Sequence, residues 1–341
     1  RDLPQTPVAN HMASARPPQS TNEVFMISPT AFESNVQAMG DNYFMRAGGN
    51  DAGTSSSESA ADAKEALRAK VVAEHEGLVT VLREVIGATV HVFAHAESYG
   101  TPDAVFPNNW FGTDCDLSQQ TRKRLTLFPM RHPNRRAERR DDLVRFLKAR
   151  YSELIDLTPH ETASASGHPG KFLEGTGAMV LDRIYKVAYV SLSERADEGV
   201  ANVWCVAHGY GLQTFNAKDT QGRPIYHTNV MMSVGTRGAI LCRPSLSDDE
   251  YAAVARGLTE TGRKIIDIDF AQMGNMCGNV LEVKGRNGTL CLLMSTNAFD
   301  SFSETQLAEI NSAWDSVAVA SIPTIEEIGG GGVRCCVAEL F

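Results

Sequence analysis

The chain has 341 residues, of which 43% are hydrophobic and 21% are charged, and its formal net charge at pH 7 is −9. This acidic balance argues against nucleic acid or an anionic membrane surface as a partner, and no apolar run is long enough to span a bilayer. The seven cysteines show no CxxC spacing and several lie in apolar runs, so we expect neither disulfides nor a metal site, and a reducing, cytoplasmic location.

Residues 1–23 are rich in Pro, Gln, Ser and Ala and contain no apolar signal core, which predicts a disordered leader. Whether residues 1–11 are native stays open, because His11-Met12 would also fit a cloning scar before a natural start. Residues 24–341 are expected to form one catalytic domain, since the hydrophobic fraction can fill one large core. Within this domain, the polar and glycine-rich stretch at about 48–63 predicts a mobile insert.

One pattern of predicted elements repeats five times along the domain. Short runs rich in Val, Ile and Leu predict strands, and longer mixed stretches between them predict helices. The strand, helix, strand and strand of each unit are expected at 24–28, about 64–85, 90–93 and 103–111; 125–128, 135–150, 154–157 and 172–180; 187–190, 198–208, 212–215 and 227–232; 239–242, 247–261, 264–268 and 278–283; and 290–294, 303–314, 317–319 and 333–341. The repeat predicts an α/β fold, a fivefold pseudo-symmetric β/α propeller around a central channel.

A basic run at 131–140 overlaps the predicted helix of the second unit. Runs of charge are usually solvated, so our first interpretation is the exposed start of that helix. An anion-binding rim is the second interpretation.

A polar residue opens the third predicted strand of every unit: Asn109, Glu174, His227, Asn279 and Cys335. Equivalent positions of a radially closed repeat converge on one axis, so we expect these side chains to meet in one active site. Cys335 is the candidate nucleophile, because four consecutive glycines before it let a ligand approach the backbone closely. The alternative is that Cys335 and Cys336 are two small buried hydrophobes.

Five segments resemble the signatures of the guanidino-group-modifying (pentein) superfamily: DAVFPNNWF at 103–111, LEG at 173–175, SER at 193–195, HTNV at 227–230 and GVRC at 332–335. The superfamily consists of fivefold β/α propellers and includes arginine deiminases, dimethylarginine dimethylaminohydrolases and amidinotransferases. The FPNNWF segment is most similar to the branch of amidinotransferase-related citrulline utilization hydrolases. The resemblance extends over residues 24–341, and its motifs follow the expected order in all five units.

The resemblance implies catalytic roles for three residues. Cys335 would be the nucleophile, with Cys336 pointing to the opposite face of a strand. His227 would protonate the leaving nitrogen and then activate water. Glu174 would accept a hydrogen bond from His227 and orient it.

The resemblance also implies substrate-binding residues. Arg195 would grip the α-carboxylate of an amino-acid substrate with its bidentate fork, the alternative being an exposed ion pair. Asp103 would be an acidic residue that contacts the substrate. Asn108, in the same segment, is also expected to bind the substrate. Asn279 would line the channel in a role that the resemblance does not define.

Two asparagines depart from the pattern of the arginine-processing members. Deiminases and dimethylarginine hydrolases carry a carboxylate at the position of Asn109, and deiminases carry a second at Asn229. Burying a guanidinium without these partners costs about 3–5 kcal/mol, whereas a neutral ureido group needs the donors and acceptors that Asn supplies. The residues therefore predict hydrolysis of citrulline to ornithine, ammonia and carbon dioxide, without a cofactor or metal.

Two other functions remain open from the sequence. One is hydrolysis or amidino transfer on arginine or methylarginine, with Asp103 supplying the charge. The other is a catalytically silent pentein that only binds a partner, against which the intact set of Cys335, His227 and Glu174 argues. The expected partner is a small amino-acid substrate, and the sequence does not decide between a monomer and a homo-oligomer.

Overall fold

The computed structural model describes residues 16–45, 57–116, 122–162 and 169–341. These residues form five three-stranded sheets. The sheets are, in the order of hydrogen-bonded neighbours, β15 (Ala338–Glu339), β1 (Glu23–Ile27) and β2 (Thr89–Phe93); β3 (Phe111–Asp116), β4 (Arg122–Leu127) and β5 (Glu153–Asp156); β6 (Met179–Asp182), β7 (Val187–Ser191) and β8 (Gly211–Phe215); β9 (Met232–Val234), β10 (Gly238–Cys242) and β11 (Lys264–Ile268); and β12 (Leu281–Lys284), β13 (Leu290–Ser295) and β14 (Ser316–Ala320).

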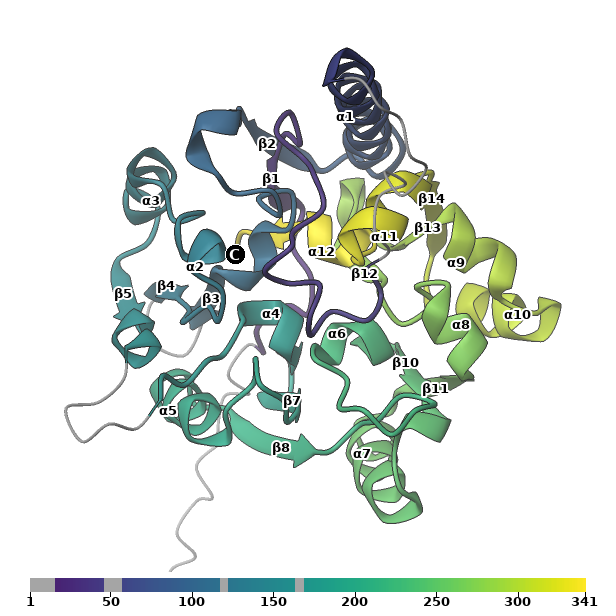
Figure 1. The fold of residues 1–341 in the computed structure, drawn as a ribbon. Helices are drawn as coiled ribbons and strands as arrows, with labels where there is room; N and C mark the ends of the chain where they lie inside the picture. The colour runs from purple at the N-terminus through teal and green to yellow at the C-terminus, as the bar shows by residue number, and fades with distance from the viewer. Residues whose placement is uncertain (1–15, 46–56, 117–121, 163–168) are drawn as a thin grey trace, which may run out of the picture.

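Every sheet combines strands of two predicted units. The middle strand runs parallel to the strand that follows its helix and antiparallel to the last strand of the preceding unit. The first sheet obeys the same rule, because Val24 of β1 lies opposite Val90 of β2 and opposite Glu339 of β15. Figure 1 shows the five sheets following one another around the middle of the molecule.

Helices on the outside connect the parallel strands (Figure 1). They are α1 (Ser57–Thr80) with its π-helical continuation η1 (Val81–Ile86), α3 (Asp141–Lys148), α5 (Glu198–His208), α7 (Asp248–Glu260) and α10 (Glu304–Ala313). Helix α7 begins with a capping box between Ser247 and Glu250 and buries Val254 and Leu258 against its sheet. The middle strands are buried on both faces, which explains why they read as continuous apolar runs.

Helix α1 begins at Ser57, before the position near 64 that the sequence predicts. Residues 57–63, the end of the segment expected to be mobile, therefore belong to a helix, and residues 48–56 lie outside the described chain. Buried Val71, Leu78 and Leu82 anchor the helix, and seven- and four-residue spacings place these side chains on one face.

Four of the five predicted third strands begin with a helical turn, so the expected strand starts are wrong. The turns are η3 (Pro107–Asn109), α4 (Gly175–Ala178), α6 (Thr228–Met231) and α12 (Val333–Cys336). Close backbone approach accounts for at least one of them: Gly175 has φ of +48°, and a Cβ there would lie 2.4 Å from the main-chain oxygen of Asn108. Asn279 instead lies in a bend two residues before β12 begins at Leu281.

Residues 16–23, the described end of the expected disordered leader, pack against the domain. The Gln19 amide donates to the main-chain oxygens of Leu181 and Val234 and accepts from the main-chain nitrogen of Arg183. Ser20 donates to Glu282. The expectation of disorder is therefore wrong for these residues, because their polar groups find partners on distant units. Among the helices of the described residues, none combines the length and apolarity needed to cross a bilayer.

Candidate active site

Glu174 and His227 immediately precede the short helices α4 and α6, and they are in direct contact. His227 Nε2 lies 2.8 Å from Glu174 Oε2, and the two side chains are 3% and 0% exposed. A carboxylate can only accept, so Nε2 carries the proton and Nδ1 keeps a lone pair. The side of the ring that carries Nδ1 faces Gly177, where a Cβ would lie 2.8 Å from Nδ1. The structure thus brings together this predicted pair.

Glu174 is held as a carboxylate. Burial alone would raise its pKa, but Arg195 and His227 outweigh that effect and hold the pKa well below its usual range. Arg195 Nη1 lies 3.5 Å from Oε2, and the main-chain nitrogen of Arg131 donates to Oε1 at 3.0 Å. Burial lowers the pKa of His227, although Glu174 opposes this shift. The resting pair is therefore a carboxylate beside a neutral imidazole.

Cys335 lies on α12 with a 5% exposed side chain. Its sulfur accepts from the amide nitrogens of Asn279 at 3.2 Å and Asn229 at 3.4 Å. Burial raises the pKa of the thiol, and these two hydrogen bonds act in the opposite direction. Cys336 is fully buried, and both cysteines belong to the same apolar cluster. Strand alternation is the wrong reason for separating the two thiols, because consecutive residues of a helical turn point about 100° apart.

Several buried polar atoms of the site lack a hydrogen-bond partner among the described residues. They are both amide atoms of Asn108, Asn109 Nδ2, Asp103 Oδ1, Asn229 Oδ1, Asn279 Oδ1 and Arg195 Nε. Unpaired buried polar groups are costly in a folded protein, which makes this set an expected lining for a polar ligand. Asp103 uses its other oxygen to accept from Asn35 at 2.7 Å, and burial raises its pKa against the opposing effect of Arg135.

Arg135 was missed as a site residue by our first interpretation of the basic run, which is wrong for this side chain. It lies on the short helix α2 (Pro133–Arg136) and is only 2% exposed. Its guanidinium makes two hydrogen bonds to Glu138, at 2.8 and 3.0 Å, and donates to Asn109 Oδ1 at 2.9 Å. A fixed positive charge therefore lies against Asn109.

Arg195 forms a buried ion pair, and the alternative of an exposed pair is wrong. Its guanidinium contacts Asp41 and Glu174 and lies 4.8 Å from the centre of the Tyr226 ring. Asp41 also accepts from Arg131 and His132, at 3.0 and 3.1 Å. Burial acts to raise the pKa of Asp41, but His132 and Arg195 lower it to about 2. Sequence reasoning missed Asp41, which lies outside the repeated elements.

The segment 31–45 that carries Asp41 crosses the middle of the molecule (Figure 1). Asn42 donates to the main-chain oxygen of Gly329 at 3.4 Å, and the ring centres of Phe44 and Tyr226 are 6.1 Å apart. A cavity of about 390 Å³ beside this segment is lined by Asp41 and Arg195, among others. The cavity therefore leads toward the Glu174–Arg195 side of the site.

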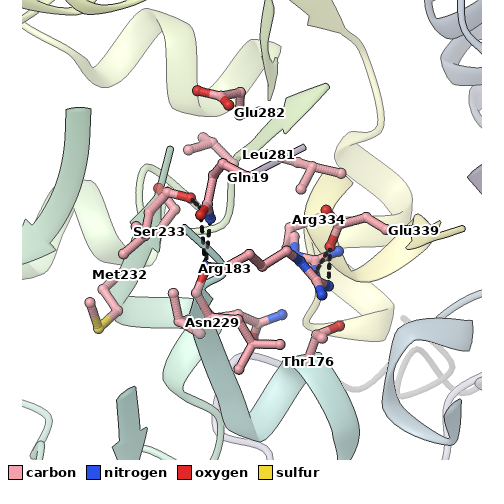
Figure 2. A pocket seen from close by; sticks show the side chains of 14 residues that line it. Gln19, Thr176, Arg183, Asn229, Met232, Ser233, Leu281, Glu282, Arg334 and Glu339 are labelled. Atoms are coloured by element: carbon pink, nitrogen blue, oxygen red, sulfur yellow. Dashed lines mark hydrogen bonds and ion pairs between the residues drawn. The ribbon is translucent and has the colours of Figure 1, made fainter. Parts of the chain in front are cut away.

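A second, smaller cavity of about 40 Å³ lies where residues 16–23 pack. Figure 2 shows Gln19, Arg183, Arg334 and Glu339 around it, together with Asn229. Arg334 donates to Glu339 at 2.8 Å, and Arg183 lies 3.5 Å from the same carboxylate. Asn229 lines this cavity and also contacts Cys335.

The comparisons with known proteins bear on the family and the fold of the chain. Residues 28–341 match the family model described as N,N dimethylarginine dimethylhydrolase, eukaryotic. No curated protein sequence matches the chain. Solved structures match over 93% of the chain at low sequence identity, and at this identity they establish the fold alone.

Three solved structures illustrate the likeness. The N-terminal domain of ArgZ from cyanobacteria, covalently bound to a reaction intermediate, is 15% identical with a TM-score of 0.68, and the match covers 94% of this chain and 97% of that domain. Against an apo structure of ArgZ, an arginine dihydrolase, the match has 16% identity and a TM-score of 0.66 and covers 93% of this chain and 40% of that one. A Pseudomonas aeruginosa dimethylarginine dimethylaminohydrolase (DDAH) mutant complexed with citrulline is 12% identical with a TM-score of 0.60, covering 93% and 98%. With the family model matching most of the sequence, the chain belongs to the N,N dimethylarginine dimethylhydrolase family of the guanidino-group-modifying (pentein) superfamily.

Proposed function

We propose that the protein is a cytoplasmic, cysteine-dependent hydrolase of the citrulline utilization branch, built as a fivefold pseudo-symmetric propeller, that cleaves citrulline to ornithine, ammonia and carbon dioxide. The observation that favours citrulline over arginine as the substrate is the charge around Asn109. This residue is a neutral amide, and the cation beside it is Arg135, whose Nη1 lies 2.9 Å from Asn109 Oδ1. A substrate guanidinium at this end of the site would lie beside the Arg135–Glu138 ion pair, and the neutral Asn109 amide would not balance its charge, whereas a ureido group needs no counter-charge.

The polar atoms left without partners suit a ureido group. Within the described part of the chain, the donor Asn109 Nδ2 and the acceptors Asn229 Oδ1 and Asn279 Oδ1 have no hydrogen-bond partner. A ureido oxygen needs donors and its nitrogens need acceptors, so these three amides offer both. Arg195, with an unpaired Nε, is proposed to bind the α-carboxylate in competition with Asp41.

In the proposed reaction, the Cys335 thiolate attacks the ureido carbon after its proton has passed to His227. The tetrahedral adduct then breaks its bond to the ornithine nitrogen, which His227 protonates, and an S-carbamoyl enzyme remains. Neutral His227 next takes a proton from water, which attacks the carbamoyl carbon and releases the thiolate. The released carbamate decomposes to ammonia and carbon dioxide. Glu174 stabilises the imidazolium that forms twice in this cycle.

A second candidate is hydrolysis of arginine or a methylarginine, or amidino transfer from arginine. The family model and the ArgZ structures favour it, and the buried Asp103 carboxylate could pair with a guanidinium. A silent binding protein is disfavoured, because the Glu174–His227 contact and the buried Cys335 form a reactive set that binding alone does not require.

The test is to incubate the protein separately with citrulline, arginine and dimethylarginine and to identify the products, with Cys335→Ser as the inactive control. Ornithine and ammonia from citrulline, with a kcat/KM at least tenfold above that for arginine, is the expected result. Citrulline accumulating from arginine or dimethylarginine, without turnover of citrulline itself, would establish the second candidate instead.

A further inference from the structure

The amides of Asn229 and Asn279 flank the sulfur of Cys335 from two different units of the fold. Asn279 Nδ2 lies 3.2 Å from Sγ, and Asn229 Nδ2 lies 3.4 Å from it. The two side chains are each 1% exposed. Among the described residues, these amides make the side-chain hydrogen bonds to the sulfur. We propose that Asn229 and Asn279 are catalytic residues that stabilise the Cys335 thiolate before substrate binds.

The orientation of the Asn279 amide follows from its second partner. Its Nδ2 also donates to the main-chain oxygen of Asn229 at 3.0 Å. A carbonyl oxygen can only accept, so the nitrogen and not the oxygen of the Asn279 side chain must face both Asn229 and the sulfur. The same bond ties the two asparagines to each other.

Glycines on either side let the pair approach. A Cβ at Gly278 would lie 2.3 Å from the main-chain oxygen of Val230, so the chain before Asn279 packs directly on the helix of Asn229. A Cβ at Gly332 would lie 2.8 Å from Asn279 Oδ1. Side chains at either position would push the amides away from α12, so the backbone itself preorganises the donors.

The Asn229 and Asn279 amides are uncharged hydrogen-bond donors. Such donors can stabilise the Cys335 thiolate without placing a further charge beside a neutral substrate. A hydrogen bond to the charged form of a group favours that form and lowers its pKa. Among the described residues, the charged and titratable groups coupled to the thiol are Arg334 on the same helix, Arg135, Tyr226 and Cys336. All of them stay unchanged when only an amide is removed.

Each amide also has an oxygen without a partner among the described residues. With the nitrogen bound to the sulfur, that oxygen is the atom left to accept from a substrate N–H group. The pair would then hold the nucleophile and the substrate nitrogens at once, a part of the inference that rests on the proposed function. An aspartate at either position would lose the donor and place a negative charge beside the sulfur.

The experiment is a spectroscopic titration of the thiolate at 240 nm in the full-length protein without substrate. The signal of Cys335 is obtained by subtracting the Cys335→Ser variant. Asn229→Ala and Asn279→Ala are each expected to raise the pKa of Cys335 by about one unit or more, which is a tenfold loss of thiolate at a pH below that pKa. Asn108→Ala removes a buried amide that makes no bond to the sulfur and is the matched control, expected to leave the titration in place.

Folding of each variant is checked by circular dichroism and thermal unfolding. If an alanine variant does not fold, Asn229→Asp and Asn279→Asp replace it, since they keep the size of the side chain and are expected to raise the pKa further. A folded variant whose Cys335 titrates within about 0.3 unit of wild type would overturn the proposal. The titration needs no turnover, so a shift in a protein inactive on citrulline would refute the proposed function and leave the amide role standing.

Discussion

Replacing Glu174 by glutamine tests whether this carboxylate acts through His227. Glu174 accepts from His227 Nε2 at 2.8 Å, from the main-chain nitrogen of Arg131 at 3.0 Å and from Arg195 Nη1 at 3.5 Å. Glutamine keeps the size but has one oxygen and an NH₂ group. At least one of the three donors would therefore face another donor, and His227 would lose the charge that stabilises its protonated form.

Two magnitudes follow from these contacts. The kcat is expected to fall by about 10²- to 10⁴-fold, the range for losing orientation and charge at a general acid–base. Unfolding free energy is expected to fall by about 1–3 kcal/mol for an unsatisfied buried donor. The loss should stay below the 3–5 kcal/mol of a fully broken buried pair, because Arg195 keeps Asp41 as a partner.

Stability should also change its pH dependence. The pKa of Glu174 lies below its ordinary value of 4.5 in the fold, so the carboxylate stabilises the protein above that pH. This contribution is lost as the pH falls toward the lower folded pKa. Wild type should therefore lose stability on acidification more steeply than Glu174→Gln, measured by urea unfolding between pH 7 and pH 3.5.

Glu282→Gln is the matched control for Glu174→Gln. Glu282 is buried and accepts from Ser20, from Thr236 and from Trp314 Nε1 at 2.9 Å, but it does not contact His227. A similar loss of stability with retained kcat is expected. The kcat of each variant is measured by steady-state kinetics. A Glu174→Gln enzyme with a kcat within threefold of wild type would refute the role of Glu174 in orienting His227. A Glu282→Gln enzyme as slow as Glu174→Gln would refute it too.

Three further outcomes are expected. Cys335→Ser should abolish turnover and Cys336→Ser should retain most of it, since the Asn229 and Asn279 amides reach the sulfur of Cys335; equal loss in two folded variants would contradict this. Asn229→Asp should increase the ratio of kcat/KM for arginine to kcat/KM for citrulline more than Asn109→Asp does. The reason is that a new carboxylate at position 109 would pair with the buried Arg135 instead of the substrate. A larger increase from Asn109→Asp would contradict the proposed role of charge in substrate choice. Gln19→Ala should lower the unfolding free energy by about 1–3 kcal/mol in urea titrations, since three partners would lose their bonds; an unchanged midpoint would show that residues 16–23 pack without stabilising the domain.

Local pattern was enough to locate most strands and the residues of two contacts, Glu174–His227 and Asn279–Cys335. The buried strand β10 (Gly238–Cys242), for example, reads as an apolar run because both of its faces are covered. The turns that carry Glu174, His227 and Cys335 could not be recognised, since four residues are too few to show helical periodicity. A glycine at a positive φ, as at Gly175, is their clearest local sign.

Long-range contacts account for what the sequence did not reveal about the site. Asp41 lies outside the repeat, and its role depends on Arg195, which is far away in the chain. Arg135 belongs to a charge run of a kind that is usually solvated, and only its contact with Asn109 shows that this guanidinium is internal. Burial of a charge is decided by tertiary partners, which single-sequence patterns do not contain.

The pairing of β1 with β15 makes the Cys335 thiol, the proposed nucleophile, one of the last groups expected to reach its folded position. Cys335 lies on the turn that leads into β15, and β15 is held by strand β1 from the other end of the described chain. Contacts between residues so far apart in sequence carry the largest loop-closure cost and form slowly. A partly folded chain can thus contain most of its sheets while the Cys335 thiol is still away from the Asn229 and Asn279 amides. The thiol would then become reactive only when the fold is almost complete. In a refolding experiment, enzyme activity would return after most of the secondary structure.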